Sequence, residues 1–237
     1  IIQSKVNKRI NLIRNQLCPE TYKEPSKEIP ILAHCQVCVV GGGPAGISAA
    51  IGSSRAGADT IIVERFGCFG GVITTVGMET LSWYRYEGTV DSEGIGIEME
   101  RLAVQMGGTS KWEFNDSPCL DAEMFKVIAD KLIVENGIRP ILHCLFVDVI
   151  REGSTITGII VETKSGRQAI ICERVVDCTG DADVAYHAGC EFTKNNPEDA
   201  LGVTTVFNVA GVDKDKFLEH IRENPATYKD WDSGWDQ

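Results

Sequence analysis

The sequence predicts an α/β fold built around a parallel sheet, and three observations lead to this prediction. Residues 37–40 are a short run of Val and Cys that ends in a glycine-rich turn. A segment of small and apolar residues begins at Pro44, and residues 60–63 form a second β-branched run. Runs of this composition are typical of strands buried on both faces of a parallel sheet, and the order strand, helix, strand is that of a βαβ unit.

The composition excludes several classes of protein. The chain has 237 residues, of which 43% are hydrophobic and 24% are charged, as is ordinary for one large or two small globular domains. No apolar run reaches the length of a membrane span. The net charge of −11 argues against nucleic acid as a partner, because a phosphate-binding surface needs clustered Lys and Arg.

The nine cysteines indicate reduced thiols. Their number is odd and several lie inside expected strands, so we expect a reducing compartment, which is the cytoplasm, or an organellar matrix if the N-terminus is a targeting signal. Cys35 and Cys38 form a C-x-x-C pair. Because no second pair offers the spacing of a zinc site, no metal is expected, and a redox role of this pair is not favoured.

Residues 1–36 are expected to form an N-terminal helix and a linker arm. Apolar residues recur at helical spacing from Ile2 to Leu17, with basic residues between them and no acid before Glu20. Such a basic amphipathic start resembles a transit peptide. A helix that docks on the protein or on a partner chain is the favoured interpretation, with residues 24–30 as the linker.

The turn after the first strand matches G-x-G-x-x-G through Gly41, Gly43 and Gly46. The first glycine allows a tight turn, the second lets the backbone approach a pyrophosphate, and the third lets helix and strand come close. The helix from Pro44 directs its free N–H groups and about half a positive charge toward the turn, which suits a diphosphate. The alternative is a crossover that binds nothing, and the complete βαβ context disfavours it.

Glu64 stands at the end of the second strand, about twenty residues after the glycines, where an acidic residue binds a ribose in dinucleotide sites. Such a carboxylate accepts hydrogen bonds from a ribose 2′-hydroxyl and repels a 2′-phosphate, so NADP is disfavoured. These features predict a site for an ADP moiety. They do not distinguish FAD from NAD.

A second glycine-rich loop follows Glu64 and is expected to approach the middle of the dinucleotide. Gly70 and Gly71 permit the close approach, and Thr74 and Thr75 are candidate hydrogen-bond donors. Cys68 lies in the same loop. It has no partner cysteine close by in sequence, so a catalytic thiol is not favoured.

Hydrophobic periodicity, caps and turns place the remaining elements. Helices are expected at residues 95–106, at 122–135 with Asp121 as N-cap, at 182–188 and at 213–224. Strands are expected at residues 141–150, at 155–163 and 167–172 as a hairpin turned at 164–166, at 175–178 and at 204–211.

The strand at 175–178 runs into a second turn of interest, Thr179-Gly180-Asp181. A strand-to-helix turn with glycine and a carboxylate is the geometry of a sheet edge that faces a ligand. Asp181 as a simple N-cap of the following helix is an equally good interpretation.

Several segments together resemble one family, the FAD-dependent oxidoreductases of the glutathione-reductase-like class. The matching segments, within residues 24–211, are EPSKEIP, VVGGGPAGISAAI, IIVERFGCFGG, ITGIIVETKSGR and VDCTGDADVAYHAG. The resemblance implies a Rossmann-like FAD-binding domain at 37–190, with an inserted β-meander and an inserted segment at about 80–120. Part of a substrate or cap domain at 191–237 would follow. Family members are usually longer, so the chain resembles a member that lacks its C-terminal part.

The resemblance also implies FAD as the cofactor and assigns residues to it. The turn at residues 41–46 would hold the pyrophosphate, and the turn at residues 179–181 would close the site. Glu64 would hold the adenosine ribose, and Val147 would offer its backbone to adenine. The candidate cofactor-binding residues are Gly41, Gly43, Pro44, Ala45, Gly46, Glu64, Arg65, Gly70, Gly71, Thr74, Val147, Thr179, Gly180 and Asp181.

The sequence therefore predicts an FAD-dependent oxidoreductase, or its FAD-binding part, that transfers hydride or electrons between flavin and a small-molecule substrate. A second chain or a C-terminal remainder is expected to complete the site. The alternatives are an NAD-dependent dehydrogenase, which Glu64 also suits, and a non-catalytic nucleotide-binding subunit that supports a partner. No catalytic residue is named, since each of the four histidines is better explained as structural or solvated.

Overall fold

A computed structural model of the chain describes residues 22–80, 85–86, 89–90, 93–110, 118–194, 196, 204–207 and 209–225. The chain divides into two units, Ile1–Pro30 and Ile31–Gln237, and each is treated by itself. The described residues of the first unit, 22–30, form neither helix nor strand. The helix predicted within residues 1–20 lies outside the described residues, as does the tail after residue 225.

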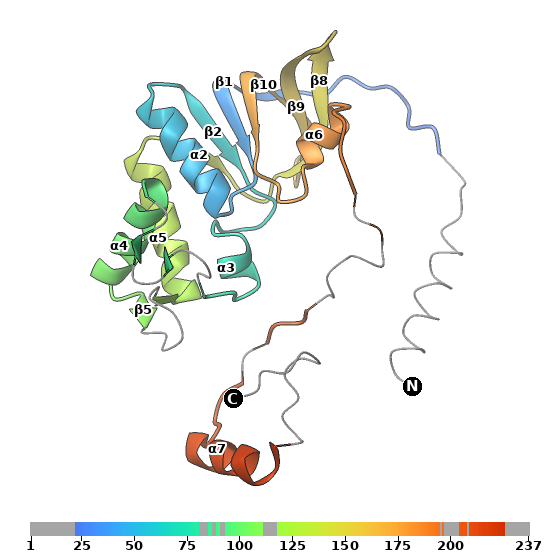
Figure 1. Ribbon diagram of the computed structural model, residues 1–237. Helices are drawn as coiled ribbons and strands as arrows, with labels where there is room; N and C mark the ends of the chain where they lie inside the picture. The colour runs from blue at the N-terminus through green and yellow to red at the C-terminus, as the bar shows by residue number, and fades with distance from the viewer. Residues whose placement is uncertain are drawn as a thin grey trace. The chain divides into compact units, whose positions relative to one another are not determined.

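The second unit is built on a six-stranded sheet of order β7-β2-β1-β10-β9-β8 (Figure 1). Its strands are β1 (Ile31–Val40), β2 (Thr60–Val63), β7 (Arg139–Ile141), β8 (Leu145–Glu152), β9 (Thr155–Thr163) and β10 (Gly166–Asp177). The strands β7, β2, β1 and β10 pair in parallel, whereas β10, β9 and β8 pair antiparallel. The predicted α/β fold with a largely parallel sheet and a β-meander is confirmed.

The helices were predicted from the sequence, except the one at residues 72–75, which lies where a loop was expected. They are α2 (Pro44–Arg55), α3 (Val72–Thr75), α4 (Ile95–Gln105), α5 (Ala122–Glu135), α6 (Asp183–His187) and α7 (Lys214–Glu223). Asp121 caps α5 as predicted, because its carboxylate accepts a hydrogen bond from the Met124 N–H at 2.8 Å. Short strand pairs are formed by β3 (Arg85–Tyr86) with β4 (Thr89–Val90) and by β5 (Thr109–Ser110) with β6 (Cys119–Leu120). No helix in the described part of the chain is long and apolar enough to cross a membrane.

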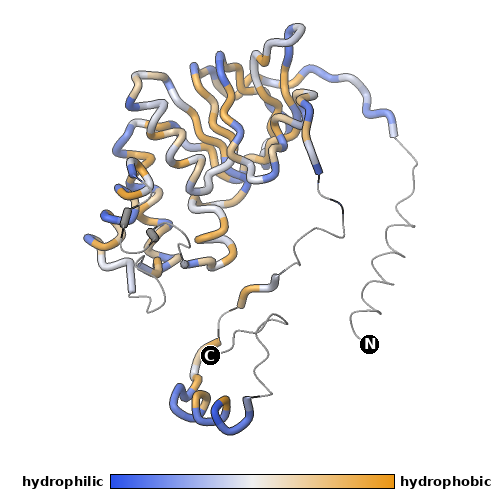
Figure 2. The backbone as a smooth tube through the Cα atoms, viewed as in Figure 1, coloured by the Kyte–Doolittle hydropathy of each residue, from blue (hydrophilic) through white to orange (hydrophobic). Residues whose placement is uncertain are grey.

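Two apolar clusters of the described residues flank the sheet. The first joins the sheet to α2, α4 and α5, which lie on one side of it in Figure 1, and includes Val39, Ile47 and Ile128. The second includes Cys38 and Val40 and otherwise draws mainly on β2, β9 and β10. Residues 37–40 of β1 thus alternate between the two clusters, which explains why this part of the strand is apolar throughout. The strands of the sheet are largely apolar in Figure 2.

The strand predicted at residues 141–150 is two strands. His143 adopts a left-handed conformation with φ of 51°, and the chain changes direction there. As a result β7 pairs in parallel with β2, whereas β8 pairs antiparallel with β9. Hydrophobic periodicity did not reveal this break, because a single histidine with positive φ carries no pattern signal.

Two other predicted strands, at 167–172 and 175–178, are one continuous strand. The strand β10 pairs antiparallel with β9 along its first half and in parallel with β1 on its other side. The meander is therefore an extension of the main sheet and not a separate insertion. The first strand also begins at Ile31, six residues before the predicted Val37, and this is where the second unit begins.

The strand predicted at residues 204–211 is wrong for the residues that the structure describes, 204–207 and 209–211, which contain no strand. A strand propensity is realised only on a sheet surface that the segment can join. The helix predicted at 213–224 is confirmed as α7. Asp213 caps it by accepting a hydrogen bond from the Lys216 N–H at 3.2 Å.

Candidate functional site

The two predicted turns meet at one edge of the sheet. β1 and β10 are parallel neighbours in which Val40 lies opposite Asp177, and the Cys178 N–H donates to the Val40 carbonyl at 2.8 Å. The Gly41 turn follows β1, and the Thr179 turn follows β10. Segments almost 140 residues apart in sequence therefore form one site at the carboxyl ends of parallel strands, where α/β proteins bind their ligands.

Protein backbone fills the side-chain space of two motif glycines. Gly41 has φ of 101°, and a Cβ atom there would lie 2.2 Å from the Cys178 carbonyl oxygen. A Cβ atom at Gly46 would lie 1.7 Å from the Gly41 carbonyl oxygen. These glycines let β10, the turn and α2 touch, which are the roles expected of the first and third positions.

Gly43 is different, because nothing in the protein requires a glycine there. Its φ is an ordinary −72°, and a Cβ atom would meet only the Gly71 Cα atom at 3.7 Å, a normal contact. Gly43 is the N-cap of α2, so the N–H groups of Ala45 and Gly46 have no acceptor within the helix. The bare backbone at this helix N-terminus suits a diphosphate, and the site therefore fits the pyrophosphate of a dinucleotide.

The loop after β2 packs on the glycine turn. The Gly70 N–H donates to the Gly42 carbonyl at 2.8 Å, and a Cβ atom at Gly71, which has φ of 55°, would lie 2.8 Å from the Gly43 Cα atom. This loop was predicted to approach the dinucleotide closely, and in the structure it closely approaches the backbone of the glycine turn. Small residues on both sides keep the backbone of the turn accessible.

Glu64 is buried, with 6% of its surface exposed, and its carboxylate holds the glycine turn. Oε2 accepts a hydrogen bond from the Gly42 N–H at 2.7 Å, and Oε1 accepts one from the Phe66 N–H at 2.8 Å. A carboxylate has about four acceptor positions, so acceptor capacity remains for a ribose hydroxyl. The tie between Glu64 and Gly42 was not predicted from the sequence.

Thr74 and Arg65 lie beside the site but are already engaged. The buried Thr74 hydroxyl donates to the Phe69 carbonyl at 2.8 Å, so it offers a ligand an acceptor and not the expected donor. Arg65 is exposed, and its guanidinium carbon lies 4.7 Å from the centre of the Phe66 ring. Both residues remain candidate cofactor-binding residues, Thr74 as a hydrogen-bond acceptor and Arg65 as a side chain that already lies against the Phe66 ring.

Val147 lies at an irregularity of β8. The register with β9 passes from Phe146 to Asp148 and skips Val147. A residue in such a bulge is not matched to a residue of the neighbouring strand, so its backbone groups are left for another partner. This position agrees with the expected role of a backbone contact to adenine, which remains a prediction.

Asp177, which the sequence analysis missed, holds the turn after β10. Its Oδ1 accepts from both the backbone N–H and the hydroxyl of Thr179, at 3.1 and 2.7 Å, and its Oδ2 accepts from the Ala185 N–H at 3.0 Å. The Thr179 hydroxyl oxygen accepts in turn from the Asp183 N–H at 2.9 Å. An acid between the apolar residues Val176 and Cys178, directly before the turn, was the available signal.

Asp181 is not the N-cap of α6. Ala182 holds that position in a left-handed conformation with φ of 59° and without a side-chain cap, and the first turn is bonded to Thr179 instead. Asp181 and Gly180 are exposed on the turn. The N-cap interpretation is thus corrected, while contact of Asp181 with a cofactor stays a prediction.

His187, one of the four histidines, connects α6 to β8. Its Nδ1 lies 3.3 Å from an Asp148 carboxylate oxygen, and its ring meets the Phe146 ring edge-on with centroids 5.5 Å apart. These contacts give His187 a structural role.

Replacing Asp177 by Asn is expected to loosen the second turn. The amide keeps one acceptor but loses the charge that several donors share, so we expect a loss of about 1.5 kcal/mol in the free energy of unfolding. Urea unfolding measures this loss. The control is Glu173→Gln, an exposed change on the same strand. Equal stability of the two variants would contradict the role given to Asp177.

The sheet order, the two turns at its carboxyl edge and the acid after β2 define a dinucleotide-binding α/β protein. The family model for FAD dependent oxidoreductases matches residues 36–236. The chain belongs to this family, and FAD is accordingly its cofactor. No curated protein matches the chain in sequence.

One solved structure shares the fold, and others are more distantly similar. A geranylgeranyl bacteriochlorophyll reductase-like protein from Thermoplasma acidophilum is 18% identical with a TM-score of 0.51, over 67% of this chain and 43% of that chain. The 3-ketosteroid-delta4-(5alpha)-dehydrogenase from Rhodococcus jostii RHA1 is 18% identical with a TM-score of 0.44, over 62% and 46%. THI4 from Thermovibrio ammonificans is 18% identical with a TM-score of 0.46, over 78% and 67%. The chain spans less than half of the first two, and at this identity the likeness concerns the fold alone.

Proposed function

We propose that the chain binds FAD through its adenosine diphosphate half and belongs to an enzyme that transfers hydride or electrons between the flavin and a small-molecule substrate. The observation that carries the proposal is Gly43. No protein atom needs the space above it, whereas a diphosphate at the N-terminus of α2 does.

In this proposal each part of the site has one task. The N–H groups of Ala45 and Gly46 donate to the diphosphate, Glu64 accepts from the ribose hydroxyls, and Val147 offers its backbone to adenine. The turn at Thr179 closes the site beside Gly41. When bound, FAD supplies a ring system that takes up and releases hydride or electrons. The residues of the chain bind and orient the cofactor.

The groups that face the flavin ring and the substrate are proposed to come from a second chain or from sequence beyond these 237 residues. The chain spans 43% of the reductase-like protein and 46% of the steroid dehydrogenase named above. We propose that residues 37–190 form the FAD-binding domain and that residues 191–237 open a substrate or cap domain.

Ligand fragments test the assignment of the adenosine half. The purified chain is titrated calorimetrically with FAD, ADP, FMN and ADP that carries a 2′-phosphate. We expect FAD and ADP to bind, ADP to compete with FAD, and the 2′-phosphate to weaken binding by about tenfold or more, since an added charge faces Glu64. Binding of FMN as tight as that of FAD would contradict the assignment.

The nucleotide that copurifies tests the choice of cofactor. A visible flavin spectrum followed by release of FAD on denaturation is expected. NAD released in place of FAD would instead favour the dehydrogenase. A chain that binds FAD but shows no flavin reduction with any reductant, even with its C-terminal remainder or partner supplied, would favour the non-catalytic subunit.

We also propose a reducing compartment such as the cytoplasm. All eight cysteines within the described residues are free thiols, and four of them are buried in the sheet unit. Buried thiols inside strands are typical of proteins that do not meet an oxidising environment.

A further inference from the structure

Three thiols meet in the sheet, away from the cofactor edge. Cys35 on β1 lies in register with Cys172 on the neighbouring strand β10. Cys38, three residues further along β1, packs with both of them in one buried cluster. Gly41 follows Cys35 by six residues, which is about 20 Å along an extended strand. The thiol cluster, which we define as Cys35, Cys38 and Cys172, is therefore separate from the cofactor site.

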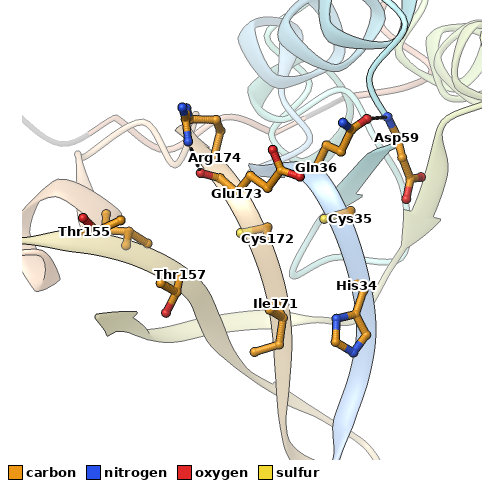
Figure 3. A pocket seen from close by; sticks show the side chains of 11 residues that line it. His34, Cys35, Gln36, Asp59, Thr155, Thr157, Ile171, Cys172, Glu173 and Arg174 are labelled. Carbon is orange, nitrogen blue, oxygen red and sulfur yellow. Dashed lines mark hydrogen bonds between the residues drawn. The ribbon is translucent and has the colours of Figure 1, made fainter. Parts of the chain in front are cut away.

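Two members of the thiol cluster line a cavity of about 590 Å³ on β1, β9 and β10 (Figure 3). Cys35 and Cys172 are 9% and 5% exposed, whereas Cys38 is 0% exposed and does not line the cavity. The other polar lining residues are His34, Gln36, Asp59, Thr155, Thr157, Glu173 and Arg174. The cavity thus borders Cys35 and Cys172 but not Cys38.

The surroundings of Cys35 favour its thiolate. The thiols of Cys172 and Cys38 donate hydrogen bonds to it and lower its pKa, and the charge of Arg139 acts in the same direction. Burial and the carboxylate of Asp59 oppose them. The pKa of Cys172 is raised to about 12, first of all by its hydrogen bond with Cys35. The hydrogen bonding thus favours a thiolate at Cys35 over one at Cys172, and the thiolate is the form that reacts with oxidants.

We propose that Cys35 is a peroxide-reactive thiolate and that Cys172 is its resolving thiol. The Cys35 thiolate sulfur attacks hydrogen peroxide, the O–O bond breaks, and a sulfenic acid forms as hydroxide leaves and takes a proton from the solvent. The Cys172 sulfur then attacks the Cys35 sulfur, the S–S bond forms, and the sulfenic hydroxyl leaves as a second water with the Cys172 proton. The thiol pair loses two electrons, and the peroxide takes them up.

The positions of the two residues allow this bond. Neighbouring strands lie about 4.8 Å apart, and disulfides join Cα atoms about 4.4–6.8 Å apart, so paired positions fall at the short end of the range. Such a bond can be opened again by thiol–disulfide exchange, as suits a reversible modification. It would join β1 and β10, the two strands whose ends carry the Gly41 and Thr179 turns.

A peptide map after peroxide treatment tests the proposal. The purified 237-residue chain is treated with one equivalent of hydrogen peroxide, its remaining thiols are alkylated, and tryptic peptides are analysed by mass spectrometry without reduction. We expect a linked pair made of residues 28–55 and 168–174, which fragmentation assigns to Cys35 and Cys172, and which dithiothreitol removes. In Cys172→Ser, dimedone is expected to label Cys35 as a sulfenic acid.

Matched variants distinguish oxidation of the thiol cluster from general oxidation of exposed thiols. The link should be lost in Cys35→Ser and kept both in Cys38→Ser and in Cys190→Ser, which removes an exposed thiol outside the thiol cluster. Oxidation of Cys190 while Cys35 and Cys172 stay free would overturn the proposal, as would a link through Cys38. The map of the unsubstituted chain decides this even if a variant fails to fold.

Discussion

Replacing Gly46 by Ala is expected to abolish FAD binding and to lower the free energy of unfolding by about 3 kcal/mol. The added Cβ atom would lie 1.7 Å from the Gly41 carbonyl oxygen, which is backbone and cannot rotate away. The clash is relieved only if α2 moves off β1. That movement also carries the N–H groups of Ala45 and residue 46 away from the proposed diphosphate position. Urea unfolding and a flavin-fluorescence titration with FAD measure the two effects.

Gly52→Ala is the matched control for this prediction. Gly52 lies in the same helix, is exposed, and would place its Cβ atom 3.9 Å from the Ile95 Cδ1 atom, an ordinary contact. Alanine is the better helix former there, so a gain of about 0.5–1 kcal/mol is expected with FAD affinity unchanged. A Gly46→Ala protein with normal stability and affinity would show that α2 is not held at this contact.

Replacing Glu64 by Gln is expected to cost about 1.5–3 kcal/mol of stability and to weaken FAD binding by about 10- to 100-fold. The carboxylate accepts from the N–H groups of Gly42 and Phe66, one on each oxygen. A glutamine amide offers one oxygen and turns an NH₂ group toward the other donor. That donor loses its acceptor in a buried position, and the glycine turn loses the tie that holds Gly42.

The experiment on Glu64 uses the same two measurements. Glu135→Gln is the control, because Glu135 lies on the exposed side of α5, where its ion pair with Lys131 is solvated. A change of less than about 0.5 kcal/mol and normal FAD affinity are expected for it. If Glu64→Gln kept wild-type stability but lost FAD affinity, the carboxylate would serve the ribose alone and not the turn.

Local chemistry made part of the fold readable from the sequence. The bounds of β2 and α5 were predicted to the residue, and those of α2 from its first residue Pro44, because β-branched runs, a proline at the start and an Asp cap act over a few neighbouring positions. The glycine motif was recognised for the same reason. Each of its positions is tied to a turn, a close approach or a helix start within one βαβ unit.

Contacts between distant segments decided the rest, and no local pattern encodes them. Only the tertiary structure showed that β10 serves both the meander and the parallel sheet, that Asp177 holds the turn at Thr179, and that Glu64 binds the Gly42 N–H. The thiol cluster is the clearest case. The C-x-x-C spacing alone did not favour a function, and Cys172 joins it through strand pairing across more than 130 residues. The sequence by itself determined which elements form, because propensity is local; which side chains meet was decided by strand register, which depends on the packing of the whole sheet.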